Sequence, residues 1–191
     1  MIYENKLVSS SGDEPITSAY VKNYLRVDFD TDDAIITALI TAARQVVEKY
    51  IEQALITKNF KCYFSQFEDW DVNGGLIYLE LPISPVTAIT AVSSVDEDGT
   101  ETAITDYKTT GLDIKTVRVN QTFTLTGGAT SGYVVEYTAL NSSIDEPIKD
   151  AIAKLVGEMY ENRQESGVDI SVSMMPFDVR AMLTNYRKTF I

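Results

Sequence analysis

Histidine is missing from the sequence, and cysteine occurs once, as Cys62. Without histidine, acid–base catalysis by imidazole and every zinc site with a histidine ligand are excluded. A single cysteine excludes an internal disulfide, which favours a chain that matures in a reducing compartment. No apolar run is long enough to cross a membrane as a helix, and the first residues lack the features of a signal peptide.

Basic residues are also scarce. Lys and Arg number 16 against 28 Asp and Glu, which gives a formal net charge of −12 at pH 7. Binding nucleic acid through the general surface needs clustered cations, so we expect this surface to repel a phosphate backbone. The 191 residues, with an ordinary apolar content of 45%, suit one domain or a core with a sizeable insertion.

The longest helical pattern runs from Asp32 to Leu55. Apolar residues recur there in two overlapping series, which together make a surface too wide for a helix that is covered from one side only. The series are Ile35, Leu39, Ala42, Val46 and Tyr50, and Ile36, Ile40, Ala43, Val47 and Ile51. A narrow solvent-exposed strip is expected at Thr37, Arg44, Gln45, Lys49 and Glu52. Residues 30–33 supply capping oxygens and negative charge at the start, so we predict a central helix.

Shorter helical patterns precede and follow this one. Thr17 is a candidate N-cap for an amphipathic helix that follows Pro15, and Ser143 with Glu146 fits a capping box for a later helix. Between residues 56 and 140 the chain is rich in strand-forming residues with regular turn signals, and Asp98-Gly99 indicates a hairpin. We expect strands at 58–67, 76–81, 89–95, 101–107, 114–119, 121–125 and 133–137.

These patterns predict an α+β protein with about four helices. Helices from both chain ends would form one core, and an antiparallel β insertion would lie between them in the sequence. The expected divisions are an N-terminal arm at 1–15 that is flexible or is ordered only by a partner, the first half of the helical core at 16–55, the β insertion at 56–140, the second half of the core at 141–165, and a C-terminal segment at 174–191.

An acidic pattern and the single cysteine are candidate chemical sites. The spacing of Asp28, Asp30 and Asp32 matches the start of a calcium loop, but the later glycine and glutamate positions are not filled, which favours helix capping. Cys62 alternates with Phe60 and Phe64, which indicates a buried strand residue and not a nucleophile.

A second acidic group surrounds the single tryptophan. Glu68, Asp69 and Asp71 beside Trp70 could form paired carboxylates next to a sugar-stacking ring, although a solvated acidic loop explains them equally well. We therefore predict no catalytic, metal-binding or cofactor-binding residue in this chain.

The last sixteen residues differ in charge from the rest. Residues 176–191 contain one acid, Asp178, against Arg180, Arg187 and Lys188, a net of +2 in a chain of −12. Two interpretations are open: a terminal helix that closes its own core, or a detachable amphipathic segment that binds a groove in an acidic partner.

Six stretches, in this order, resemble the phage head–tail connector family, the portal adaptor or head-completion proteins of long-tailed phages. They are ITSAYVKNYLRVD, DDAIITALITAARQVVEKYI, LELPISPVTAITAVSSVDEDGT, TDYKTTGLD, EPIKDAIAKLVGEMYENRQE and MPFDVRAMLTNYR. The resemblance extends from Ile16 to Arg187, and the polar N-terminal arm departs from it. It implies a non-enzymatic ring of about a dozen copies that docks on the portal, extends the DNA channel and presents a platform to the next neck or tail-completion protein.

The resemblance also implies where partners would bind, because the C-terminal segment of the family usually engages the portal. The portal-interface residues expected on this basis are Phe177, Arg180, Met182, Leu183, Tyr186, Arg187, Lys188, Phe190 and Ile191. Removal of residues 176–191 is then expected to abolish portal binding and to leave the fold nearly intact. An acidic lumen would keep DNA from adhering, and the candidates for it are Asp28, Asp30, Asp96, Glu97 and Asp98.

The expected partners are the portal, neighbouring copies and a neck or tail-completion protein, with DNA passing through without specific binding and with no cofactor. The expected location is the head–tail interface of the virion, after assembly in the cytoplasm of a bacterial host. Two other functions stay open. The chain could be a neck or tail-completion protein further from the portal, or a hydrolase or carbohydrate-binding module that uses the β insertion.

Overall fold

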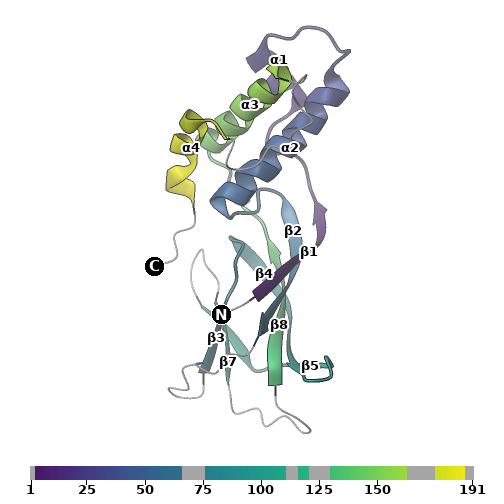
Figure 1. Ribbon diagram of the computed structural model, residues 1–191, viewed down its shortest axis with the longest axis vertical. Helices are drawn as coiled ribbons and strands as arrows, with labels where there is room; N and C mark the ends of the chain where they lie inside the picture. The colour runs from purple at the N-terminus through teal and green to yellow at the C-terminus, as the bar shows by residue number, and fades with distance from the viewer. Residues whose placement is uncertain (1–2, 66–75, 111–115, 121–129, 163–174, 188–191) are drawn as a thin grey trace. The chain divides into compact units, whose positions relative to one another are not determined.

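The computed structural model describes residues 3–65, 76–110, 116–120, 130–162 and 175–187 (Figure 1). The chain forms two compact units, a β unit of residues 1–11 and 57–140 and a helical unit of residues 12–56 and 141–191. The fold is mixed α+β with antiparallel strands, as the sequence predicts. No helix among the described residues has both the length and the apolar character needed to cross a membrane.

The strands described in the β unit form two antiparallel sheets. The first has the strand order β1-β2-β8-β4-β5, with bounds Tyr3–Ser11, Thr57–Ser65, Thr130–Ala139, Val86–Asp96 and Glu101–Ala103. The second has the order β3-β7-β6, with bounds Leu76–Glu80, Thr116–Asn120 and Tyr107–Thr110. The predicted strands at 58–67, 76–81, 89–95, 114–119 and 133–137 correspond to β2, β3, β4, β7 and β8. The prediction for 101–107 is wrong in part, because that stretch divides between β5 and β6, and 121–125 lies outside the described residues.

The inner face of β2 carries the alternation expected from the sequence. Phe60, Cys62 and Phe64 are buried, and Cys62 lies opposite Val135 of β8. The rings of Phe60 and Tyr137 stack with centroids 5.2 Å apart. Burial raises the pKa of the Cys62 thiol to about 12, so the side chain packs as an apolar group and is not a nucleophile.

The predicted hairpin at Asp98-Gly99 is confirmed, since β4 and β5 pair antiparallel on either side of it. Gly99 has φ of 82°, a left-handed conformation that costs glycine little. Oδ1 of Asp96 accepts hydrogen bonds from the backbone N–H groups of Asp98 and Thr100 at 3.1 and 2.7 Å. The turn is therefore closed by its own acidic side chain.

The flexible arm predicted for residues 1–15 is wrong over Tyr3–Ser11, which is strand β1. It pairs antiparallel with β2 from Tyr3 opposite Phe64 to Ser11 opposite Thr57, with an irregularity between Leu7 and Ser9. Backbone hydrogen bonding needs no apolar alternation, so a polar segment without a pattern joins a sheet when an edge is available. The local sequence could not reveal that edge.

The described residues of the helical unit form four α-helices around one apolar core. They are α1 (Ser18–Leu25), α2 (Asp33–Ile51), α3 (Glu146–Glu161) and α4 (Phe177–Leu183), and the short 3-10 helix η2 (Thr184–Tyr186) follows α4. Helix α2 packs against α1, α3 and α4, and the long helices α2 and α3 lie side by side in Figure 1.

Only one of the two apolar series of α2 is fully buried, the series from Ile36 to Ile51. The other is partly exposed, and Ile35 retains 44% of its exposure. The helix ends at Ile51, four residues before the predicted end at Leu55, and its C-cap Glu52 has φ of 58°. The prediction that Arg44 lies on a solvent-exposed strip is wrong, because Arg44 is only 4% exposed.

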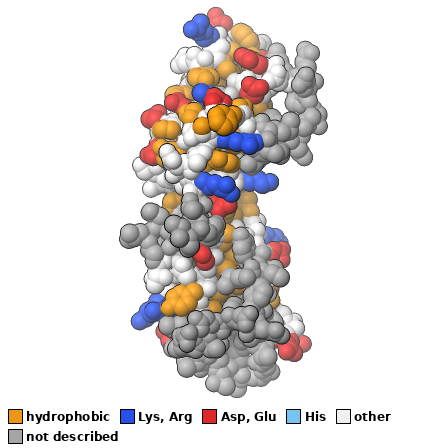
Figure 2. Space-filling model, turned by 60° about the vertical axis from the view of Figure 1, so that its left-hand side comes forward, with side chains coloured by type: hydrophobic (Ala, Val, Ile, Leu, Met, Phe, Trp, Pro, Cys, Tyr) orange, Lys and Arg blue, Asp and Glu red, His pale blue; other side chains and the backbone are white. Residues whose placement is uncertain are grey.

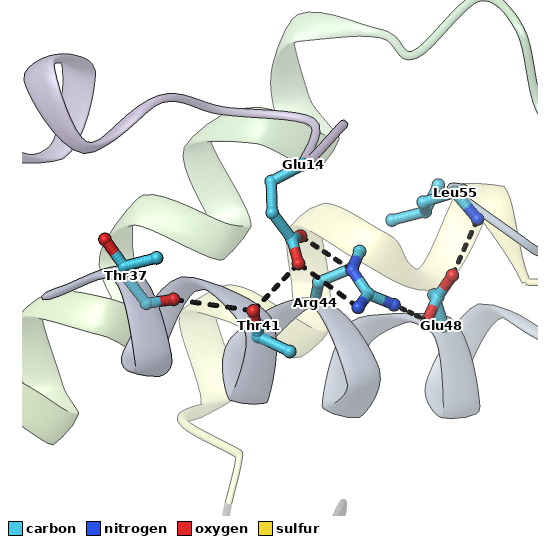
Figure 3. A network of polar contacts seen from close by, with 6 residues as sticks. All are labelled: Glu14, Thr37, Thr41, Arg44, Glu48 and Leu55. Atoms are coloured by element: carbon cyan, nitrogen blue, oxygen red, sulfur yellow. Dashed lines mark hydrogen bonds and ion pairs between the residues drawn. The ribbon is translucent and has the colours of Figure 1, made fainter. Parts of the chain in front are cut away.

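Arg44 is buried because two carboxylates neutralise it (Figure 3). Its Nε donates to Oε2 of Glu14 at 2.7 Å, and its Nη1 donates to Oε2 of Glu48 at 2.6 Å. Glu14 also accepts from Thr41 Oγ1 at 2.8 Å, and Glu48 accepts from the backbone N–H of Leu55 at 2.8 Å. The network ties the segment before α1 and the segment after α2 to the middle of α2.

The predicted N-cap of α1 is confirmed, since Thr17 Oγ1 accepts from the N–H of Tyr20 at 3.1 Å. The capping box predicted at Ser143 is wrong: α3 begins at Glu146 with Asp145 as N-cap and no side-chain cap hydrogen bond. A proline in its first turn already lacks one of the N–H groups that a cap would satisfy.

The acidic group before α2 serves tertiary contacts more than capping. Asp32 occupies the N-cap position without a side-chain cap hydrogen bond, and its Oδ2 accepts from Tyr160 Oη at 2.5 Å. Asp30 and Asp33 each accept from Lys22 Nζ at 2.7 Å, and these hydrogen bonds raise the pKa of Lys22. The capping predicted from residues 30–33 is thus replaced by contacts to α1 and α3.

Candidate interaction surface

The C-terminal segment is anchored in the helical unit by its inner face. Val179 and Leu183 of α4, one helical turn apart, are 1% and 0% exposed, and Met175 just before the helix is 3% exposed. All three belong to the core that α2 and α3 form. Of the two interpretations that the sequence leaves open, this position is that of a helix that closes its own core.

Polar contacts hold the same segment from several sides. Asp178 pairs with Lys154 of α3 at 2.8 Å, and this hydrogen bond lowers the pKa of Asp178. Gln53 donates from Nε2 to the backbone carbonyl of Tyr186 at 2.8 Å. The guanidinium carbon of Arg187 lies 5.8 Å from the centroid of the Tyr50 ring, a cation–π distance.

The outer face of α4 carries an isolated aromatic residue. Phe177 is 87% exposed, the largest value among the exposed large hydrophobic residues of the described chain. Single exposed apolar residues are common on protein surfaces, but one at this degree of exposure is available to anchor a partner. Ala181 and Thr184 on the same segment are also exposed.

The structure describes six of the nine predicted portal-interface residues, and these six occupy three environments. Phe177 and Arg187 are exposed, Arg180, Met182 and Tyr186 are half-buried, Leu183 is buried, and Lys188, Phe190 and Ile191 lie outside the described residues. In this conformation Leu183 has no surface to offer a partner. The helical spacing of this segment could have distinguished its two faces. Val179 and Leu183 are one turn apart and share a helix face, and Phe177 does not lie on that face.

A groove of about 510 Å³ lies beside α4, between the end of α1 and helix α3. Charged side chains of both signs line it, among them Arg26, Lys154, Glu158 and Glu161. Pro176 and Asp178, the chain neighbours of Phe177, belong to the same lining. Figure 2 likewise shows red, blue and orange side chains interspersed over the face of the helical unit that it presents.

The five acidic residues predicted to face a channel belong to two different units. Asp28 and Asp30 lie between α1 and α2 in the helical unit, whereas residues 96–98 form the β4–β5 turn. Asp30 is paired with Lys22 and Asp96 closes its turn, so these two carboxylates have structural partners. Asp28, Glu97 and Asp98 are exposed.

The described residues contain no group of three or more cysteine or acidic side chains arranged to hold a metal ion. The candidate carboxylate pair around Trp70, residues 68–71, lies outside the described residues. The features that sequence reasoning missed are the buried Arg44 network and strand β1, and both depend on partners far away in the chain.

The fold and this surface define a class: a mixed α+β protein of two units, with a packed terminal helix that presents an exposed aromatic residue. A family model described as head completion protein matches residues 14–189. The chain belongs to the head completion protein family, which is structural and not enzymatic. The resemblance stated from the sequence is confirmed.

Three solved structures share the fold, each with 22% sequence identity. A chain in the neck of an empty GTA particle, computed with C6 symmetry, has a TM-score of 0.68 and the match covers 100% of this chain and 97% of that chain. A chain in the virion of a native gene transfer agent (GTA) particle has a TM-score of 0.70, and the match covers 98% of this chain and 96% of that chain. A chain in the neck of a native GTA particle, computed with C12 symmetry, has a TM-score of 0.63, and the match covers 97% of this chain and 97% of that chain. No curated protein matches the chain.

Proposed function

We propose that this protein is a head–tail connector of a phage or phage-like particle. Copies of it form a ring under the portal, extend the DNA channel and provide the platform for the next neck or tail protein. The observation that carries this proposal is the head completion family match, which runs through both units from residue 14 to 189. The similar folds come from GTA particles, and two of them from necks computed with C6 and C12 symmetry, which supports a ring.

A ring suits this work because it repeats one head-to-tail contact and multiplies weak interfaces by the number of copies. In the proposal the helical unit, with parts at 16–55 and 141–165, is the body of the connector, and the β unit is an insertion in it. The particle is assembled in the host cytoplasm and the protein stays at the head–tail interface of the virion. The net charge of −12 supports a lumen that passes DNA without binding it, with Asp28, Glu97 and Asp98 as candidate wall or rim residues.

The portal contact is assigned to the outer face of α4 while the helix stays packed. Detachment would expose Val179 and Leu183, and each large apolar side chain costs about 1.5–3 kcal/mol to expose. Removal of residues 176–191 would delete the same core residues, so the expectation that the fold survives that truncation is withdrawn. The assignment instead rests on Phe177, with Arg187 at the end of the segment.

The experiment compares two exposed aromatic residues in binding to the purified portal. Phe177→Ser is expected to weaken binding about 30-fold, the loss of an aromatic anchor worth about 2 kcal/mol. Tyr78→Ser, at a residue 53% exposed on β3, is the matched control and should bind as the wild type does. Equal binding of the two variants would refute the assignment to α4.

Two further outcomes separate the proposed function from its alternative. Images of the protein mixed with portal should show an added ring on the portal. Binding to isolated tail tube, without binding to portal, would instead identify a neck or tail-completion protein further from the head.

A further inference from the structure

Strand β1 is held in its sheet by backbone pairing with β2, and the side chains of residues 4–11 are not part of the buried core. Of its described side chains, Asn5 is half-buried and the others are exposed, with Leu7 at 47% and Val8 at 62%. Among residues 4–11, two side chains hydrogen-bond to the sheet: Asn59 Nδ2 donates to Ser9 Oγ at 2.8 Å, and Tyr137 Oη donates to Asn5 Oδ1 at 3.4 Å. Withdrawal of residues 4–11 would therefore expose a strand edge and little apolar surface.

The C-terminal segment, by contrast, is held by buried side chains. The sequence favours a detachable C-terminal segment, but Val179 and Leu183 of α4 lie in the core. The inner face of β2 is buried opposite β8, and Cys62 and Phe64 there are both 0% exposed. The pairing of β2 with β8 does not itself involve β1.

After β1 the chain passes through a glycine with a positive φ and then through an anchored glutamate. The boundary between the two units falls between Ser11 and Gly12, and Gly12 has φ of 110°, a conformation that favours glycine. Two residues further on, Glu14 is clamped to Arg44 and Thr41 of α2 (Figure 3). A change of backbone direction at Gly12 would redirect β1 and leave the clamp in place.

We propose that β1 is exchanged between copies of this chain, so that β1 of one copy pairs with β2 of its neighbour. The occupant of the β2 edge is then a second copy, and the pairing seen here already shows that this sequence fits that edge. Exchange from each copy to the next is a head-to-tail contact, which can close into a ring. The inference rests on the proposed ring and names the link between its neighbours.

Exchange replaces each hydrogen bond of the β1–β2 ladder by an identical one from another chain. It therefore adds a connection between copies at little cost in contacts within each copy.

The test uses a cysteine pair across β1 and β2. Ser9 and Asn59 are register partners with side chains in hydrogen-bond contact, so cysteines at both positions can form a disulfide. Native Cys62 stays in place, because its burial and raised pKa keep it from reacting. Ser9→Cys and Asn59→Cys are placed on separate chains, co-expressed, oxidised in the assembled oligomer, and analysed on a non-reducing gel.

Exchange predicts a disulfide-linked pair that contains one chain of each variant, and no such product from either variant expressed alone. With both cysteines on one chain, most of the protein should appear as a ladder of covalent multimers. Lys61→Cys with Glu136→Cys, a register pair of β2 and β8, is the control and should give only disulfides within one chain.

The outcomes separate this inference from the proposed function. A ring in which the Ser9–Asn59 disulfide forms only within each chain overturns the exchange and leaves the connector function standing. A protein that forms no oligomer, with or without portal, overturns both. Light scattering of the same samples measures the mass of the oligomer and so shows whether a ring has formed.

Discussion

Arg44 and Glu48 form a buried ion pair one turn apart on α2, with Nη1 and Oε2 2.6 Å apart and side chains 5% and 4% exposed. Burial by itself lowers the pKa of Arg44, but the hydrogen bond to Glu14 and the charges of Glu48 and Glu14 raise it on balance. Such a pair adds little net stability over an apolar pair, yet removal of one partner leaves a buried charge uncompensated.

Arg44→Met is therefore expected to lower the free energy of unfolding by about 3–5 kcal/mol, measured by urea denaturation. Lys154→Met, which breaks the exposed pair with Asp178, is the control and should cost less than about 1 kcal/mol. Arg44→Met combined with Glu48→Leu should recover part of the loss, because no charge from this pair then stays buried. Equal costs for the two single variants would show that the Arg44 network is structurally unimportant.

The two faces of α4 should respond differently to truncation. Leu183→Ala removes a fully buried side chain and is expected to cost about 2–5 kcal/mol of unfolding free energy. Phe177→Ala, on the exposed face, should stay within about 0.5 kcal/mol of the wild type. A Leu183→Ala variant as stable as wild type would mean that α4 is not packed in solution, and the detachable-segment interpretation would return.

The pKa of Asp178 reports whether α4 is docked on α3. The hydrogen bond from Lys154 holds this pKa below its ordinary value of 3.8. A depressed folded pKa stabilises the protein above the unfolded value, and this contribution is lost as the pH falls through the folded pKa. NMR titration of the carboxyl group should show a return toward the ordinary value in Lys154→Met, and no change in Lys22→Met. An unperturbed pKa in the wild type would contradict the pairing.

Two glycines of the β unit should differ in their tolerance of alanine. A Cβ on Gly132 of β8 would lie 2.5 Å from the backbone oxygen of Phe64, so Gly132→Ala must shift the β2–β8 ladder. Gly99 in the hairpin has no atom within 4 Å of such a Cβ, and Gly99→Ala meets only the left-handed φ of 82°. We expect Gly99→Ala to lower the free energy of unfolding by about 1–2 kcal/mol and Gly132→Ala to lower it by more. The reverse order would contradict the register of β8.

Local patterns were sufficient where a residue's environment depends on its neighbours in the chain. Thr17 is the N-cap that its position before α1 predicts, because capping involves only the next few residues. Phe60, Cys62 and Phe64 alternate on a half-buried strand, as the period of two requires. The capping predictions fail at Ser143, where α3 begins at Glu146 without a side-chain cap, and at Asp32, whose carboxylate accepts from Tyr160 of α3.

What the sequence by itself determined was the mixed α+β content, the course of the long helix, most of the strands and the resemblance to a structural head-completion family. Only the tertiary structure decided that Arg44 is buried, that residues 3–11 form a strand, and that Leu183 faces the core while Phe177 faces solvent. The reason is physical: periodicity and capping act within a few residues. A buried charge, an edge strand and the docking of a terminal helix depend on partners that are distant in the sequence and that the fold alone brings near.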